Sequence, residues 1–129
     1  MNVPGQLRYS RDHEWVGRDS DGAGTVRIGI TDYAQDALGD VVFVQIPTVG
    51  TTVTDGDAFG EVESTKSVSD IYAPVAGTVA AVNDALSDAP QLLNEDPYGD
   101  GWICTIDMSD PSQYDALLDA EAYQALIEG

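Results

Sequence analysis

Hydrophobic and polar positions along the chain form short runs that are separated by turn-forming residues. β-branched residues dominate residues 25–30 (TVRIGI) and 41–46 (VVFVQI), and residues 58–64, 67–72, 77–82 and 101–106 fit further strands. Turn signals such as Asp55-Gly56 and Asp100-Gly101 punctuate the sequence between these runs. The pattern predicts a mainly β domain, built as a small barrel or sandwich.

Two segments interrupt the strand pattern and favour helices. Residues 31–38 (TDYAQDAL) carry Thr31 in the N-cap position and Asp32 in the first turn, and Gly39 follows the last helical residue. Residues 111–127 begin with a proline suited to a first helical turn, and their apolar residues recur at helical spacing. We expect a short internal helix and a C-terminal helix that breaks into two pieces near Asp119.

Length and charge limit the organisation and the partners of the protein. A chain of 129 residues is expected to form a single domain, residues 1–129. The formal net charge of −18 repels phosphate backbones and anionic lipid, so we expect no nucleic acid and no membrane as a partner. The N-terminal residues lack a basic region followed by an apolar one, which favours a cytoplasmic location. The acidic charge either attracts basic protein faces or reflects the amino-acid composition of the lineage, in which arginine replaces lysine.

Few residues offer candidate chemistry. Cys104 is the only cysteine, so neither an intramolecular disulfide nor a Cys/His zinc site is expected, and its strand-like surroundings indicate a buried thiol. His13 lies between two acidic residues, but no serine or cysteine nucleophile has an evident elbow around it. We interpret His13 as structural.

Lys66 is the only lysine in the sequence. It lies between two predicted strands with a very short connection, which places it at the tip of a tight hairpin. Three interpretations remain open: an ordinary solvated lysine, a Schiff-base lysine, and an amine displayed for covalent modification. The nearby acids Glu61, Glu63 and Asp70 stabilise the charged amine, which disfavours the Schiff-base enzyme.

The hairpin resembles the lysine hairpin of lipoyl-attachment domains, in the pattern Glu63-x-x-Lys66 followed by Pro74-x-x-Gly77. Across the chain, the sequence is similar to the glycine cleavage H-protein family. The segments that carry the resemblance are YSRDHEW (9–15), GITDYAQ (29–35), LGDVVFV (38–44), ESTKS (63–67), SDIYAP (69–74) and NEDPYGDGW (94–102). The resemblance implies a lipoyl/biotinyl-type barrel-sandwich hybrid fold, with a short internal helix and C-terminal helices.

The resemblance also implies a non-catalytic carrier role in the glycine cleavage system, with lipoate attached to Lys66 in amide linkage. The implied partners are glycine decarboxylase, aminomethyltransferase, dihydrolipoyl dehydrogenase and the lipoyl-attaching enzymes. In the implied cycle, the carrier takes an aminomethyl group from the decarboxylase to the transferase and is then reoxidised by the dehydrogenase. An alternative is a relay that passes lipoyl groups to other 2-oxoacid dehydrogenase complexes.

In this family the loaded arm folds back into a cleft on the carrier. By resemblance, Glu14 and Asp70 are the acids expected to receive the amine of the arm there. Asp12 is a third matching position, but we interpret it as an ordinary solvated carboxylate.

Overall fold

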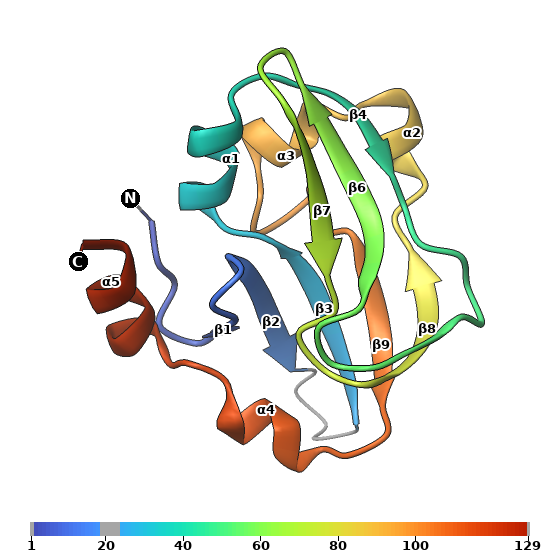
Figure 1. The fold of residues 1–129 in the computed structure, drawn as a ribbon, viewed down its shortest axis with the longest axis vertical. Helices are drawn as coiled ribbons and strands as arrows, with labels where there is room; N and C mark the ends of the chain where they lie inside the picture. Colours follow the sequence, from blue (N-terminus) through green and yellow to red (C-terminus); the bar gives the residue numbers. More distant parts are fainter. Residues whose placement is uncertain (1, 19–23, 129) are drawn as a thin grey trace.

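The computed structural model describes residues 2–18 and 24–128 and is mainly β, as predicted (Figure 1). Its strands are β1 (Arg8–Tyr9), β2 (Glu14–Arg18), β3 (Thr25–Ile30), β4 (Val41–Gln45), β5 (Thr52–Val53), β6 (Ala58–Ser64), β7 (Val68–Tyr72), β8 (Gly77–Val82) and β9 (Cys104–Met108). Its helices are α1 (Asp32–Leu38), α2 (Ala85–Asp88), α3 (Leu92–Glu95), α4 (Ser112–Ala116) and α5 (Ala120–Glu128).

The strands form two antiparallel sheets that share one core. The larger sheet has the order β1-β2-β3-β9-β8-β5, and the smaller has the order β4-β6-β7. Side chains from both sheets fill the core, including Val16, Ile28 and Ile106 from the larger sheet and Val62 and Ile71 from the smaller one. The smaller sheet crosses in front of the larger one in Figure 1, and its β6–β7 hairpin extends to the top of the view.

Helix α1 begins and ends where the sequence signals predict. Thr31 is the N-cap, and its side-chain oxygen accepts a hydrogen bond from the backbone N–H of Ala34. Gly39 follows the helix with a φ of 82°, and its N–H donates to the carbonyl oxygen of Gln35. The positive φ is one that glycine adopts without strain, so the chain leaves the helix sharply and enters β4.

The C-terminal segment forms two helices, α4 and α5, with the break in the predicted region. Tyr123 of α5 is fully buried against Tyr9 and Trp15, which form a second apolar cluster beside the main core. The rings of Tyr9 and Tyr123 stack with their centroids 4.6 Å apart. This cluster fixes α5 against β1 and β2.

Several elements differ from the sequence prediction. Strand β9 begins at Cys104 rather than at residue 101, because the preceding turn is closed by hydrogen bonds from Gly101 N to Asp96 O and from Trp102 N to Gly99 O. Strand β2 was not among the predicted strands. Its first three residues, Glu14, Trp15 and Val16, are all buried, so it lacks the apolar–polar alternation that marks a strand in sequence. The short elements β1, β5, α2 and α3 have too few residues to show a period.

Candidate functional site

The hairpin between β6 and β7 is closed by a turn of residues 65–67 whose geometry Ser64 fixes. The hydroxyl oxygen of Ser64 accepts hydrogen bonds from the backbone N–H groups of Lys66 and Ser67, at 3.2 and 3.1 Å. The N–H of Ser64 donates to the carbonyl oxygen of Ser67 at 2.8 Å. The backbone is therefore held by Ser64, and the exposed side chain of Lys66 is not needed to form the turn.

The hairpin tip lies against the connection between α1 and β4. The N–H of Thr65 donates to the carbonyl oxygen of Asp40 at 3.0 Å. The aliphatic stem of Lys66 lies across Gly39, because a side-chain carbon at position 39 would be only 3.1 Å from Lys66 Cε. Glycine thus leaves room for the lysine stem at the C-terminal end of α1.

Asn94 of α3 braces this connection from the inside. Its side-chain amide donates to the carbonyl oxygen of Gly39 at 2.9 Å and to Gln35 Oε1 at 3.0 Å. The side-chain oxygen of Asn94, Oδ1, accepts a hydrogen bond from the backbone N–H of Val41 at 2.9 Å. One side chain therefore ties the end of α1 to the start of β4, beneath the residue on which Lys66 rests.

A cleft of about 270 Å³ lies between α1 and the edge strand β7. Its walls come from the β1–β2 turn, from α1 and from the start of β7, and the cleft begins at Ser67, the residue after the lysine. The described lining residues are Asp12, His13, Glu14, Ile30, Tyr33, Ala34, Ala37, Leu38, Val62, Ser67, Val68, Ser69, Asp70 and Ile71. The lining combines an apolar wall with acidic groups.

Glu14 is the buried acid of this cleft, with only 2% of its surface exposed. Its carboxylate accepts hydrogen bonds from the hydroxyl of Ser10, at 2.5 Å, and from the N–H of Tyr72 on the free edge of β7, at 3.4 Å. Burial raises the pKa of Glu14 to about 7, although the hydrogen bonds from Ser10 and Tyr72 oppose the shift. A cation entering the cleft would therefore meet a carboxyl group that ionises near neutral pH.

Asp70 and Asp12 occupy the rim of the same cleft, and both are exposed. Asp70 pairs with Glu61 across β6 and β7, on the face of the sheet that points away from the core. The structure thus brings the two predicted acids, Glu14 and Asp70, to one cleft, but in different surroundings.

His13 forms part of the cleft wall and is fixed from behind by the C-terminal helix. Its backbone φ is 71°, a value that non-glycine residues rarely adopt. The hydroxyl of Tyr123 lies 2.8 Å from His13 Nδ1 and 2.8 Å from Thr31 Oγ1. Burial lowers the pKa of His13, so the ring is largely neutral at neutral pH. These contacts give His13 a structural role in shaping the cleft.

Three other kinds of feature bear on function: metal-binding clusters, membrane-spanning helices and the cysteine thiol. Among residues 2–18 and 24–128, no group of three or more His, Cys, Asp and Glu side chains is placed to hold a metal ion. Within the same residues, no helix has the length and apolarity needed to cross a bilayer. Cys104 is buried on β9 as predicted, and burial raises the pKa of its thiol to about 12.

A domain of two antiparallel sheets that displays a lysine on a β-hairpin beside a cleft has the architecture of the lipoyl-type barrel-sandwich class. The sequence profile described as "Glycine cleavage H-protein" matches residues 7–129 of the chain. The chain belongs to the glycine cleavage H-protein family.

Individual relatives agree with this assignment. The chain is 58% identical to the glycine cleavage system H protein of Cronobacter sakazakii, over 98% of this chain and 97% of the relative. It is 61% identical to that of Micrococcus luteus, over 95% and 94%. A crystal structure of the H protein from Mycobacterium marinum superposes with a TM-score of 0.88 at 43% identity, and covers 98% of this chain and all of that one. The predicted barrel-sandwich fold is thereby confirmed.

Proposed function

We propose that this chain is the non-catalytic lipoyl carrier of a cytoplasmic glycine cleavage system, and that Lys66 is its attachment residue. The observation that carries the proposal is the placement of the only lysine of the sequence, exposed at the tip of the β6–β7 hairpin. Membership of the H-protein family makes the chain a component of that system and supports a lipoyl cofactor.

The residues around Lys66 fit an attached lipoyl group. The turn is held by Ser64 rather than by the lysine, so acylation of the amine leaves the backbone contacts intact. The cleft begins one residue beyond the lysine, and its wall of Tyr33, Ala34 and Leu38 suits an aliphatic arm. When bound, lipoate supplies a disulfide that opens to accept a group and closes again on oxidation.

The cleft residues supply shelter for a cargo amine. We assign Glu14 as the main acceptor, because a charge-assisted hydrogen bond is strongest where water is excluded, and Asp70 as a contributor at the rim. The shelter depends on an ionised Glu14, whose pKa is about 7 without the amine. A cationic amine favours the ionised form, and retention weakens as acidification protonates the carboxylate.

The proposed partners are the enzymes that must reach Lys66 in turn. These are the lipoyl-attaching enzymes, glycine decarboxylase, aminomethyltransferase and dihydrolipoyl dehydrogenase. A tethered arm raises the local concentration of the carried group at each docked active site, so the carrier does not need to bind any one enzyme for long.

Amine labelling tests the attachment site. After expression in a host that attaches lipoate, we expect intact-mass and peptide analysis to find one lipoyl group, on Lys66. An amine-reactive reagent should modify Lys66 in the unmodified protein and no side chain in the lipoylated protein, because the sequence has no other lysine. Labelling of Lys66 in the lipoylated protein would place the attachment elsewhere, and a borohydride-trapped carbonyl adduct would support a Schiff-base enzyme instead.

The role of Glu14 can be measured on the carrier loaded with the aminomethyl group. Glu14→Gln keeps the size of the side chain but removes its charge, and we expect it to speed the decay of the loaded carrier about tenfold, as a loss of roughly 1.4 kcal/mol implies. Decay is followed by mass spectrometry in the absence of aminomethyltransferase. Asp70→Asn, the matched change at an exposed position, should have a smaller effect. Decay of both variants at the parent rate would show that the acids give no shelter.

A further inference from the structure

The outer face of the small sheet carries two rows of side chains that do not pack in the core. Val44 of β4 and Val62 of β6 are paired and buried, so they mark the inner face. The neighbouring residues therefore point outward. One outward row, from β4 to β7, is Phe43, Glu63 and Val68, and the next is Gln45, Glu61 and Asp70.

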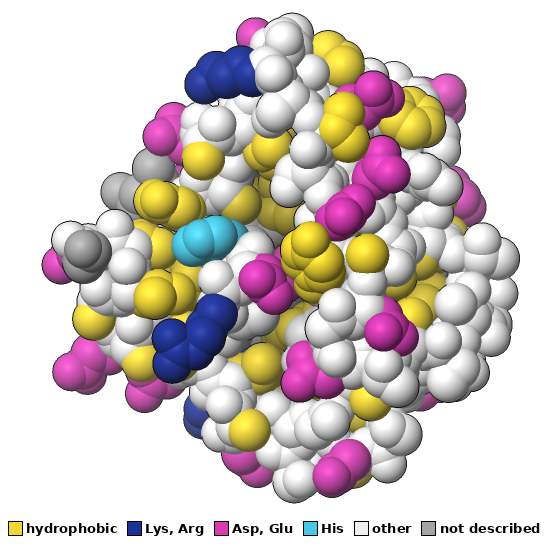
Figure 2. All heavy atoms as spheres, in the orientation of Figure 1, with side chains coloured by type: hydrophobic (Ala, Val, Ile, Leu, Met, Phe, Trp, Pro, Cys, Tyr) yellow, Lys and Arg dark blue, Asp and Glu magenta, His cyan; other side chains and the backbone are white. Residues whose placement is uncertain are grey.

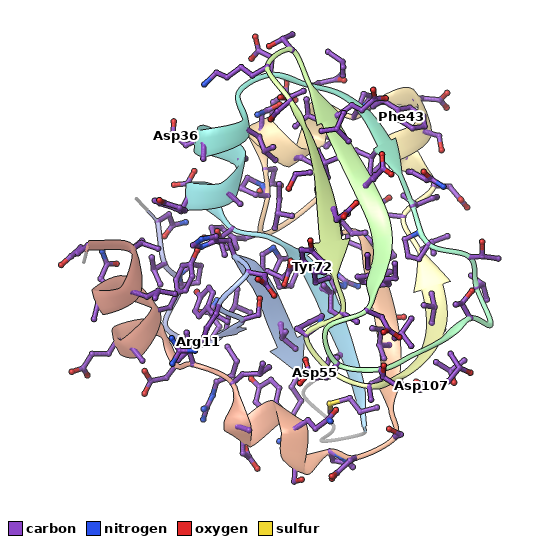
Figure 3. All side chains as sticks on the ribbon, viewed as in Figure 1. Arg11, Asp36, Phe43, Asp55, Tyr72 and Asp107 are labelled. Carbon is purple, nitrogen blue, oxygen red and sulfur yellow. The ribbon has the colours of Figure 1, made fainter. Side chains whose placement is uncertain are left out.

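Large apolar side chains are concentrated on this face, close to the attachment lysine. Val42 is 55% exposed, Phe43 is 49% exposed and Val68 is 57% exposed. Val68 follows Lys66 by two residues, and Phe43 lies opposite Glu63 near the same end of the sheet. We call the residues Val42, Phe43, Glu61, Glu63, Val68 and Asp70 the hairpin face. In Figure 2, hydrophobic and acidic side chains are interspersed over this part of the molecule, and Figure 3 labels Phe43 on β4.

The charged residues of the hairpin face are all acidic, and the only positively charged side chain beside them, in the part of the chain that the structure describes, is that of Lys66. Three members of the face are carboxylates, and the arginines of the chain, at positions 8, 11, 18 and 27, belong to the segment from β1 to β3. Figure 3 places Arg11 far from Phe43. Amide formation at Lys66 removes the positive charge from the hairpin tip. The face is then apolar and anionic, which complements a partner surface that is basic and partly apolar.

We propose that the hairpin face is the docking surface through which the carrier contacts a basic, partly apolar rim around the active sites that receive the Lys66 arm. The inference rests on the proposed function. An active site that takes in an arm attached at the hairpin tip must bring its rim to the surface next to that tip. The apolar residues there supply contact area, and the carboxylates supply orientation and speed of encounter.

Threonine substitutions test the apolar part of the face. Phe43→Thr and Val42→Thr place β-branched residues on β4 while removing apolar contact area, and neither residue lines the cleft. Val49→Thr is the matched control, because Val49 is 54% exposed but lies in the connection between β4 and β5. We expect the first two changes to raise the KM for the lipoylated carrier about tenfold with glycine decarboxylase and dihydrolipoyl dehydrogenase, with kcat at saturating carrier unchanged. Val49→Thr should leave both constants at parent values.

The contribution of the acidic residues is tested by measuring how the KM depends on salt concentration. Glu63→Gln should raise the KM at low ionic strength and make it less sensitive to added sodium chloride, because one attractive charge has been removed. An unchanged salt dependence would overturn the electrostatic half of the proposal.

Three outcomes would overturn the docking surface, and they are distinguishable. Parent KM values for both Phe43→Thr and Val42→Thr, in a carrier shown by mass to be lipoylated, would reject the surface and leave the carrier function standing. A parent protein that receives no lipoyl group in a competent host would reject both. A concentration-dependent dimer in sedimentation experiments that Phe43→Thr abolishes would make the face a contact between two copies of the chain.

Discussion

Replacing Lys66 with arginine is expected to abolish glycine cleavage while the fold remains intact. A guanidinium group is not acylated by lipoyl-attaching enzymes, so the variant should gain no lipoyl mass and should support no glycine–bicarbonate exchange. Lys66 is exposed, and its turn is held by Ser64, so the free energy of unfolding should change by no more than about 0.5 kcal/mol. Urea denaturation, intact mass and the exchange reaction check the three parts separately.

A second variant shows whether position matters as well as chemistry. Adding Arg11→Lys to the Lys66→Arg background keeps one lysine in the chain but moves it to an exposed turn away from the hairpin. We expect no lipoylation of this double variant, because the enzyme must recognise the hairpin as well as the amine. Exchange activity in Lys66→Arg alone would contradict the carrier assignment, and lipoylation at position 11 would contradict the role of the hairpin.

The β6–β7 hairpin that carries Lys66 was predictable because its determinants are local. Two strand-like runs with a very short connection specify the β6–β7 hairpin, and the strands have the expected bounds to within one residue. The cap at Thr31 and the glycine at position 39 specify α1 in the same way. Lys66 and these signals lie within a few residues of the structures that they determine.

The cleft was not predictable from local pattern, because distant segments create it. The resemblance pointed to Glu14 and Asp70, but only the register of the strands shows that one acid is buried and the other exposed. Glu14 meets Tyr72, which lies 58 residues away along the chain. His13 is held by Tyr123 from α5, and Asn94 braces the end of α1 from α3. No short stretch of sequence records these contacts.

Strand β2 is another element that the local sequence pattern did not predict. Its sequence, EWVGR, includes two charged residues and a glycine, which argue against a strand. Trp15 packs in the cluster with Tyr9 and Tyr123, while Val16 packs in the main core. The strand is therefore buried on both faces at its first residues, and the usual alternation disappears.

Burial of Glu14 should make the stability of the protein depend on pH in a defined direction. The pKa of this carboxyl group rises from 4.5 to about 7 on folding, so between these values the folded state binds more protons than the unfolded state. Stability is then lost as the pH rises from the lower value to the higher one, and the full cost is present above about pH 7. A side chain at position 14 that does not titrate avoids the free-energy cost of ionising a buried carboxyl group.

Glu14→Gln isolates the effect, because glutamine occupies the same volume and its side-chain oxygen can still accept a hydrogen bond from Ser10 or Tyr72. We expect the free energy of unfolding of the variant, relative to the parent, to increase by about 2–3 kcal/mol between about pH 5 and about pH 8. Urea denaturation at several pH values measures the difference, in which the other titrating groups largely cancel. Asp70→Asn, the same acid-to-amide change at an exposed position, is the control. Parallel curves for Glu14→Gln and the parent would mean that the carboxylate is ionised in the folded protein without cost. In that case water reaches Glu14, and the cleft cannot strengthen its hold on a cargo amine by excluding solvent.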